Sequence, residues 1–168
     1  NNLTASVGFK FSQGRYIVGN PFTSYTVAGG FSYSFWAQLP EESAVEERRI
    51  WRGSSVAQYA AFSGTNFRAV FQGGSQFFHQ WDVSSIDKTL WNHYTVTWRG
   101  DFAESPQLWV NGASLGFGVL IGTAPGATDT PSTIESLYVL DDPLGGTDRE
   151  AKALVQDLAF FSKFREFL

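Results

Sequence analysis

The chain has 168 residues, of which 43% are hydrophobic and 17% charged, so its composition predicts one domain with a substantial core. Its 12 Lys and Arg are scattered and the formal net charge is −4, which argues against nucleic acid as a partner. No apolar run approaches the ~20 residues of a membrane span, and without Cys there is no disulfide frame or thiolate chemistry.

Aromatic residues make up 17% of the chain, and near its beginning they alternate with polar residues, as in strands with one buried face. Val7–Phe11 and Arg15–Val18 are the first two expected strands. Phe31–Leu39 gives the clearest pattern, because its odd-numbered residues are all apolar, while Trp36 interrupts the polar face. Pro40–Arg49 carries the charge run and is expected to be a solvated loop.

Four short strands are expected next, with Gly- and Ser-containing turns between most of them. They are Ile50–Arg52, Gln58–Phe62, Phe67–Phe71 and Gln76–Val83. Strands that recur at roughly 8–12 residues with turn residues between them indicate a sandwich or barrel.

The strongest hairpin signal follows. Tyr94–Trp98 places a large apolar residue at every second position, and Leu108–Val110 repeats the pattern. Asn111 and Gly112 both tolerate the positive φ of a tight type I′ turn, so this region predicts antiparallel strands. The Gly-, Ala- and Thr-rich segment Gly112–Pro131 is expected to be irregular.

The C-terminal part predicts two further strands, Ser136–Leu140 and Ala153–Phe161. The polar segment Asp141–Glu150 is expected to be a loop, and Ser162–Leu168 to add one helical turn. Because no segment has the helical length of a β-α-β unit, the whole chain, residues 1–168, is predicted to be a single all-β domain with at most one or two short helical turns.

Several of these segments resemble the laminin-G-like, or concanavalin A-like, lectin and glucanase superfamily. Leu108–Gly112 is similar to its "l-y-v-n-G" strand and turn, and four other parts of the chain match in the expected order. Those parts are Gly8–Val18, Phe31–Ala37, Trp91–Thr97 and Val155–Phe161. The resemblance implies a jelly-roll sandwich of two antiparallel sheets, with binding loops at one rim.

The same resemblance frames the question of catalysis. Glycosidases on this scaffold carry Glu-x-Asp-x-x-Glu on one strand, because hydrolysis needs two carboxylates about 5–9.5 Å apart. The sequence contains no such run, and His79 and His93 lie in no nucleophile motif. We therefore predict that the chain is not an enzyme, with a glycoside hydrolase as the last alternative.

A ligand would instead bind to aromatic platforms with polar groups beside them. Trp36 and Trp109 lie opposite the apolar faces of their strands, and Trp81 ends an aromatic strand. Tyr59 and Arg99 would add polar contacts. These five residues are the candidate ligand-binding set, and the alternative for each Trp is packing in the core or under a loop.

The resemblance also implies a rim calcium site in many relatives, built from the hard oxygen ligands that Ca²⁺ prefers. Asp141 and Asp142 are the densest acidic pair and the candidate ligands. A solvated loop before Pro143 explains the pair equally well, so Ca²⁺ stays a possible cofactor.

The leading functional hypothesis is a non-catalytic binding or adhesion module for a glycan or cell-surface ligand, extracellular or surface-displayed. The alternative is a structural or decoration subunit of a virion or extracellular assembly, whose neighbours would contact apolar residues. These are Phe77, Phe78, Phe164, Phe167 and Leu168. The chain contains no Met, which indicates a processed or an excised chain.

Overall fold

A computed structural model describes residues 16–18, 25–26, 30–39, 47–53, 58–71, 77–100, 104–123, 133–134, 137–140 and 153–161. These residues form strands and their connections, with no helix among them. Every strand pairing between them is antiparallel. The predicted all-β sandwich is therefore confirmed.

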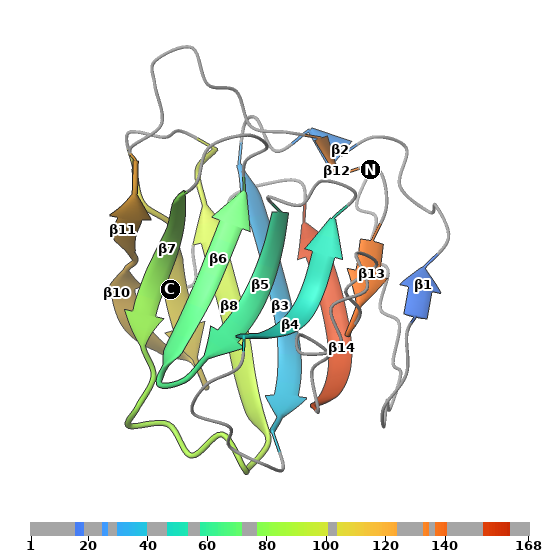
Figure 1. Ribbon diagram of the computed structural model, residues 1–168, viewed down its shortest axis with the longest axis vertical. Helices are drawn as coiled ribbons and strands as arrows, with labels where there is room; N and C mark the ends of the chain where they lie inside the picture. Colours follow the sequence, from blue (N-terminus) through green and yellow to red (C-terminus); the bar gives the residue numbers. More distant parts are fainter. Residues whose placement is uncertain are drawn as a thin grey trace.

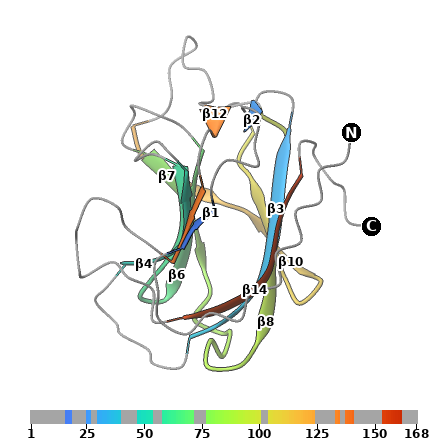
Figure 2. The same cartoon turned by 90° about the vertical axis from the view of Figure 1, so that its right-hand side faces the viewer.

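Two sheets stack face to face, as Figures 1 and 2 show. The seven-stranded sheet consists, in spatial order, of β1 (Tyr16–Val18), β13 (Leu137–Val139), β4 (Glu47–Gly53), β5 (Gln58–Ser63), β6 (Asn66–Phe71), β7 (Phe77–Asp82) and β11 (Val119–Gly122). The five-stranded sheet consists of β10 (Ala113–Phe117), β9 (Gln107–Val110), β8 (Asn92–Trp98), β3 (Phe31–Gln38) and β14 (Leu154–Phe161). A two-stranded sheet pairs β12 (Thr133–Ile134) with β2 (Tyr25–Thr26).

An aromatic core joins the two sheets. Tyr33 of β3 and Trp51 of β4 meet edge to face, with ring centroids 5.0 Å apart and planes at 82°. Phe62 of β5 and Tyr94 of β8 repeat this contact at 5.1 Å and 75°. Such pairs contribute about 0.5–1.5 kcal/mol each beyond the burial of their area. The inward residues predicted for Phe31–Leu39 and Tyr94–Trp98 are all buried.

The predicted turn after β9 is also confirmed. Asn111 has φ of 52° and Gly112 has φ of 81°, the two positive values that a type I′ turn needs. The Asn111 side chain secures the turn, because its Oδ1 accepts a hydrogen bond of 2.8 Å from the His93 backbone N–H. This fixes the register of β9 against β8, and with it the side chains that share a face.

The expectation that Gly112–Pro131 is irregular is wrong for its first part. β10 pairs with β9 at the edge of one sheet, and β11 pairs with β7 at the edge of the other. The chain crosses between the sheets at Gly118, where an added Cβ would lie 2.7 Å from Cζ2 of Trp81 and 2.9 Å from Cβ of His79. Pairing with distant strands overrides the weak strand propensity of a Gly-rich sequence.

The solvated loop expected over Pro40–Arg49 is also wrong at its end, since β4 begins at Glu47. The charge there is balanced inside the sheet: Glu47 carboxylate oxygens lie 3.0 Å from Arg49 Nε and 3.3 Å from Arg68 Nη1. The predicted elements over Val7–Phe11, Asp141–Glu150 and Ser162–Leu168 lie outside the described residues.

Candidate functional site

The outer face of the five-stranded sheet carries a diagonal of aromatic side chains. Strand register places Trp36 of β3 opposite His93, Trp109 of β9 opposite Thr95, and Phe117 of β10 opposite Gln107. Because Tyr94, Val96 and Trp98 of β8 point into the core, its other residues face outward. From strand spacing and residue rise, the Trp36 and Trp109 backbones lie about 12 Å apart, and those of Trp109 and Phe117 about 8 Å apart.

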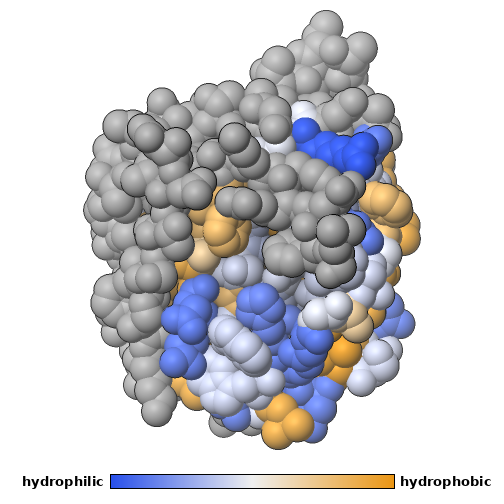
Figure 3. Space-filling view, turned by 180° about the vertical axis from the view of Figure 1, so that it is seen from behind, coloured by the Kyte–Doolittle hydropathy of each residue, from blue (hydrophilic) through white to orange (hydrophobic). Residues whose placement is uncertain are grey.

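These rings differ in their access to solvent. Trp36 is 40% exposed and Phe117 is 67% exposed, while Trp109 is half-buried. Trp36 packs against His93, with ring centroids 5.1 Å apart. Burial lowers the pKa of His93, and the Asp157 carboxylate opposes this more weakly, so the imidazole is neutral near pH 7. The described part of this face is mainly hydrophilic or neutral in Figure 3, with apolar residues towards its margins.

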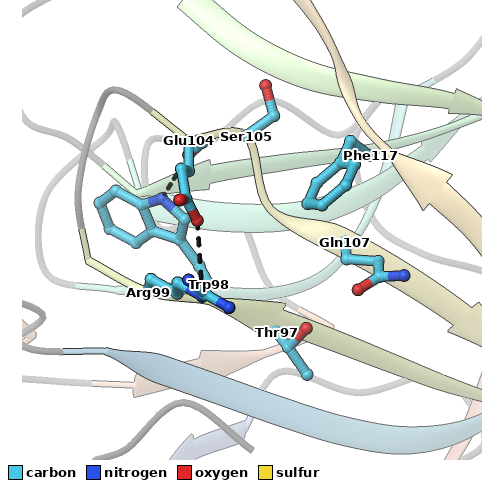
Figure 4. Close-up of a pocket in the computed structure, with 7 residues that line it drawn as sticks. All are labelled: Thr97, Trp98, Arg99, Glu104, Ser105, Gln107 and Phe117. Atoms are coloured by element: carbon cyan, nitrogen blue, oxygen red, sulfur yellow. Dashed lines mark hydrogen bonds and ion pairs between the residues drawn. The ribbon is translucent and has the colours of Figure 1, made fainter. Parts of the chain in front are cut away.

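A cavity of about 460 Å³ lies at the Phe117 end of the diagonal (Figure 4). Its lining combines polar groups with two aromatic rings: Thr97, Trp98, Arg99, Glu104, Ser105, Gln107 and Phe117. Thr97, Trp98 and Gln107 come from β8 and β9, whereas Arg99, Glu104 and Ser105 belong to the connection between these strands. The cavity is therefore bounded by the sheet on one side and by a loop at its end.

Hydrogen bonds and one ion pair position these lining residues. Arg99 Nε lies 3.4 Å from Glu104 Oε2, and the indole N–H of Trp98 donates to the Glu104 carbonyl at 3.0 Å. The Gln107 Nε2 donates to Ser114 Oγ at 2.8 Å. The Oγ1 of Thr97 is buried and has no hydrogen-bond partner among the described residues. In Figure 4 this hydroxyl points towards the space between the Arg99 and Gln107 side chains.

Three of the five predicted ligand-binding residues belong to this face or its cavity, and two do not. Trp36 and Trp109 lie on it, as the strand alternation indicated, and Arg99 lies just past the end of β8, in the lining of the cavity. Tyr59 lies on the outer face of the other sheet, where the Arg49 guanidinium carbon sits 4.6 Å from its ring centroid.

Trp81 was predicted to bind a ligand, but it is buried in the structure. It is only 4% exposed, its ring packs against Phe67 at 6.0 Å, and its indole N–H donates to the Gly116 carbonyl at 2.9 Å. Phe77, His79 and Trp81 occupy the inward positions of β7, opposite inward residues of β6 where the two strands pair. Its ring therefore has no face left for a ligand.

Sequence reasoning missed Glu104, Gln107 and Phe117. Phe117 was missed because its segment was expected to be irregular. The alternation of Leu115, Phe117, Val119 and Ile121 was the available signal, although the intervening glycines weakened it.

Comparisons with known proteins now identify the fold. A family model described as the concanavalin A-like lectin/glucanases superfamily matches residues 11–166. The chain belongs to this superfamily. No curated protein sequence matched the chain.

Several solved structures are similar to this concanavalin A-like domain. The receptor-binding domain of botulinum neurotoxin D has a TM-score of 0.65 and 16% identity, covering 94% of this chain and 40% of that one. The binding domain of botulinum neurotoxin DC in complex with SialylT has a TM-score of 0.61 and 13% identity, over 99% of this chain and 44% of that one. Trypanosoma rangeli sialidase in complex with sialic acid has a TM-score of 0.56 and 11% identity, over 82% of this chain and 21% of that one.

At these identities the similarity shows a common fold, and the chain spans less than half the length of each structure. Within the described residues, no helix is long and apolar enough to span a membrane.

Metal-binding side chains do not gather in the described part of this concanavalin A-like domain. No group of three His, Asp or Glu residues there is arranged to hold an ion. The predicted calcium ligands Asp141 and Asp142 lie outside the described residues.

The predicted assembly contacts are placed only in part. Phe77 is buried in the core, contrary to its expected exposure, because it points inward on β7. The Arg68 guanidinium carbon lies 4.6 Å from the ring centroid of the half-buried Phe78. Phe164, Phe167 and Leu168 lie outside the described residues.

Proposed function

We propose that this domain is a non-catalytic, lectin-like binding module that holds a glycan on the outer face of its five-stranded sheet. The observation that carries the proposal is the aromatic diagonal from Trp36 through Trp109 to Phe117, set among uncharged polar side chains. Exposed rings offer flat apolar surfaces to the C–H faces of sugars, and the polar groups between them bond to hydroxyls.

The superfamily and the similar structures support a binding function. The superfamily includes lectins, and two of the similar structures are binding domains of secreted toxins. One of those structures is described as a complex with SialylT. By analogy, we place the present domain outside the cell or on a surface, where such ligands occur.

For four of the five described acidic residues, the surroundings argue against a role as general acid. Hydrogen bonds from Ser84 lower the pKa of Asp82, and hydrogen bonds from Thr89 lower that of Asp87. A general acid needs the opposite shift, towards a protonated carboxyl at neutral pH. Glu47 and Glu104 are paired with arginines.

A glycan array followed by calorimetric titration, with and without Ca²⁺, tests the proposal. We expect Trp36→Ala and Trp109→Ala each to weaken binding about 2- to 13-fold, the loss of one ring contact of about 0.5–1.5 kcal/mol. Leu90→Ala is the matched control, because Leu90 is an exposed apolar residue in the connection between β7 and β8. A wild-type protein that binds no glycan under either condition would overturn the proposal.

The second candidate function, a structural subunit of a virion or other extracellular assembly, is favoured by a different feature. Leu115, Phe117, Val119 and Ile121 are exposed large apolar residues on β10 and β11, which are edge strands of the two sheets. Residues 113–122 carry no charge, so this edge lacks the charged residues that usually prevent strand addition.

Sedimentation at increasing protein concentration tests the assembly function. The assembly function predicts concentration-dependent association that Val119→Lys abolishes, while Leu90→Lys leaves it unchanged. A monomer at every concentration would contradict association between copies.

A further inference from the structure

The cavity beside Phe117 has a mixed chemistry that narrows the class of ligand. We propose that it receives a neutral monosaccharide at the end of a glycan chain, an inference that rests on the proposed glycan-binding function. Its volume of about 460 Å³ falls in the range of small-ligand sites, about 300–1,000 Å³.

The charges of the described residues that line the cavity cancel. Arg99 and Glu104 contribute one positive and one negative side chain at 3.4 Å, each about half exposed. Two neighbouring hydroxyls of a sugar can accept a hydrogen bond from the guanidinium and donate one to the carboxylate. The carboxylate of an anionic sugar would have to displace Glu104 from Arg99 to bind the guanidinium, and otherwise lies against the Glu104 carboxylate, so the pair disfavours an anionic sugar.

The remaining lining groups also match a sugar ring. Gln107 uses its N–H to hold Ser114, which leaves its amide oxygen to accept a hydrogen bond from a hydroxyl. The buried Thr97 hydroxyl, unpartnered within the described part of the chain, needs a polar group from a ligand or water. Phe117, 67% exposed, supplies an aromatic surface at the side of these polar groups.

The position of the cavity indicates the terminal residue of the glycan. It lies at one end of the aromatic diagonal, and Glu104 and Ser105 belong to the loop that bounds it there. A glycan lying along Trp36 and Trp109 would therefore place its end, and not an internal unit, in the cavity.

The test uses immobilised oligosaccharides in matched pairs, one ending in a neutral hexose and the other extended by a terminal sialic acid. We expect the wild-type domain to bind the neutral member at least about 10-fold more tightly. Glu104→Gln should reduce this preference to below about 3-fold, because it weakens the neutral complex and removes the repulsion of the anionic one. Phe117→Ala should weaken neutral binding about 3- to 10-fold.

The outcomes separate this inference from the proposed function. Glycan binding that depends on Trp36 and Trp109 but is unchanged in Phe117→Ala and Glu104→Gln would overturn the cavity assignment alone. A wild-type preference for the sialylated member would overturn its neutral character. Absence of binding to every glycan would overturn both proposals. Thermal unfolding of each variant, with Leu90→Ala as control, verifies that the exposed substitutions leave the fold intact.

Discussion

The outer faces of the two sheets both carry aromatic rings, but they differ in what covers those rings. On the seven-stranded sheet, the guanidinium carbons of Arg49 and Arg68 lie 4.6 Å from the ring centroids of Tyr59 and Phe78. On the five-stranded sheet, Trp36 is 40% exposed and Phe117 is 67% exposed.

The arginines on the seven-stranded sheet are held in place by other contacts. Glu47 bonds to both Arg49 and Arg68, and Arg68 also donates to Gln80 Oε1 at 3.2 Å. A cation already occupies the ring face that a ligand would use. The neighbours of an aromatic residue, more than its presence in a strand, therefore decide whether it is available for binding.

The largest expected effect is a difference in stability between a variant of the buried Trp81 and a variant of the exposed Trp36. Trp81→Ala should lower the free energy of unfolding by about 3–5 kcal/mol, because it empties a core position. Trp36→Ala should change it by about 0.5 kcal/mol or less, since that ring is on the surface. Urea unfolding of both variants measures the difference. Similar losses for the two would contradict the assignment of one ring to the core and the other to a binding face.

The next largest effect is on the pH dependence of stability, which should differ between His79 and His93. Burial lowers the pKa of His79 from 6.5 to about 4, while a hydrogen bond with the Gly118 backbone opposes the shift more weakly. Because the unfolded chain binds the proton more tightly, neutral His79 contributes to the free energy of unfolding. This contribution is fully present above about pH 6.5 and is lost as the pH falls through 4. The loss amounts to about 3 kcal/mol.

Unfolding free energies between pH 7 and pH 4 check this linkage. His79→Gln should reduce the pH dependence relative to wild type, whereas His93→Gln, at a half-buried position, should reduce it less. Equal slopes for wild type and His79→Gln would show that His79 does not titrate in this range.

A smaller effect is expected at the crossing between the sheets. The methyl group of Gly118→Ala would lie 2.7 Å from a Trp81 ring atom, so the ring and the adjoining backbone must shift. We expect a loss of about 1–3 kcal/mol in stability and weaker glycan binding, because Phe117 is the preceding residue. Leu115→Ala, on the exposed part of β10, is the control and should leave stability unchanged. A fully stable Gly118→Ala would mean that the crossing is loosely packed.

The contrast between these regions also explains how far the sequence alone could predict the structure. Strict alternation placed Trp36 outward on β3 and Tyr94 inward on β8, because each strand has one apolar and one polar parity. The Phe77–Trp81 segment has aromatic residues at both parities, so alternation could not orient Trp81. The register of β7 with β6 places Trp81 opposite the inward Phe67, and Trp81 therefore points into the core.

The cavity was even harder to predict from the sequence, because its lining is brought together by the pairing of strands. Arg99 was predicted to contact a ligand, but Glu104 and Phe117 reach it only because β9 and β10 pair beside β8. Local sequence gives the propensity of each strand, whereas the neighbours of a strand are set by the packing of the whole sandwich.

The smallest expected effect is at Tyr59, on the outer face of the seven-stranded sheet. Tyr59→Ala removes the ring beneath the buried Arg49 and should lower stability by about 1–2 kcal/mol, the strength of a partly desolvated cation–π contact. Glycan affinity should stay within about twofold of wild type, because the guanidinium, and not a ligand, occupies that ring. Calorimetric titration beside Trp36→Ala provides the measurement. If Tyr59→Ala weakened glycan binding as much as Trp36→Ala, the covered face would also be a binding face, and the distinction between the two sheets would fail.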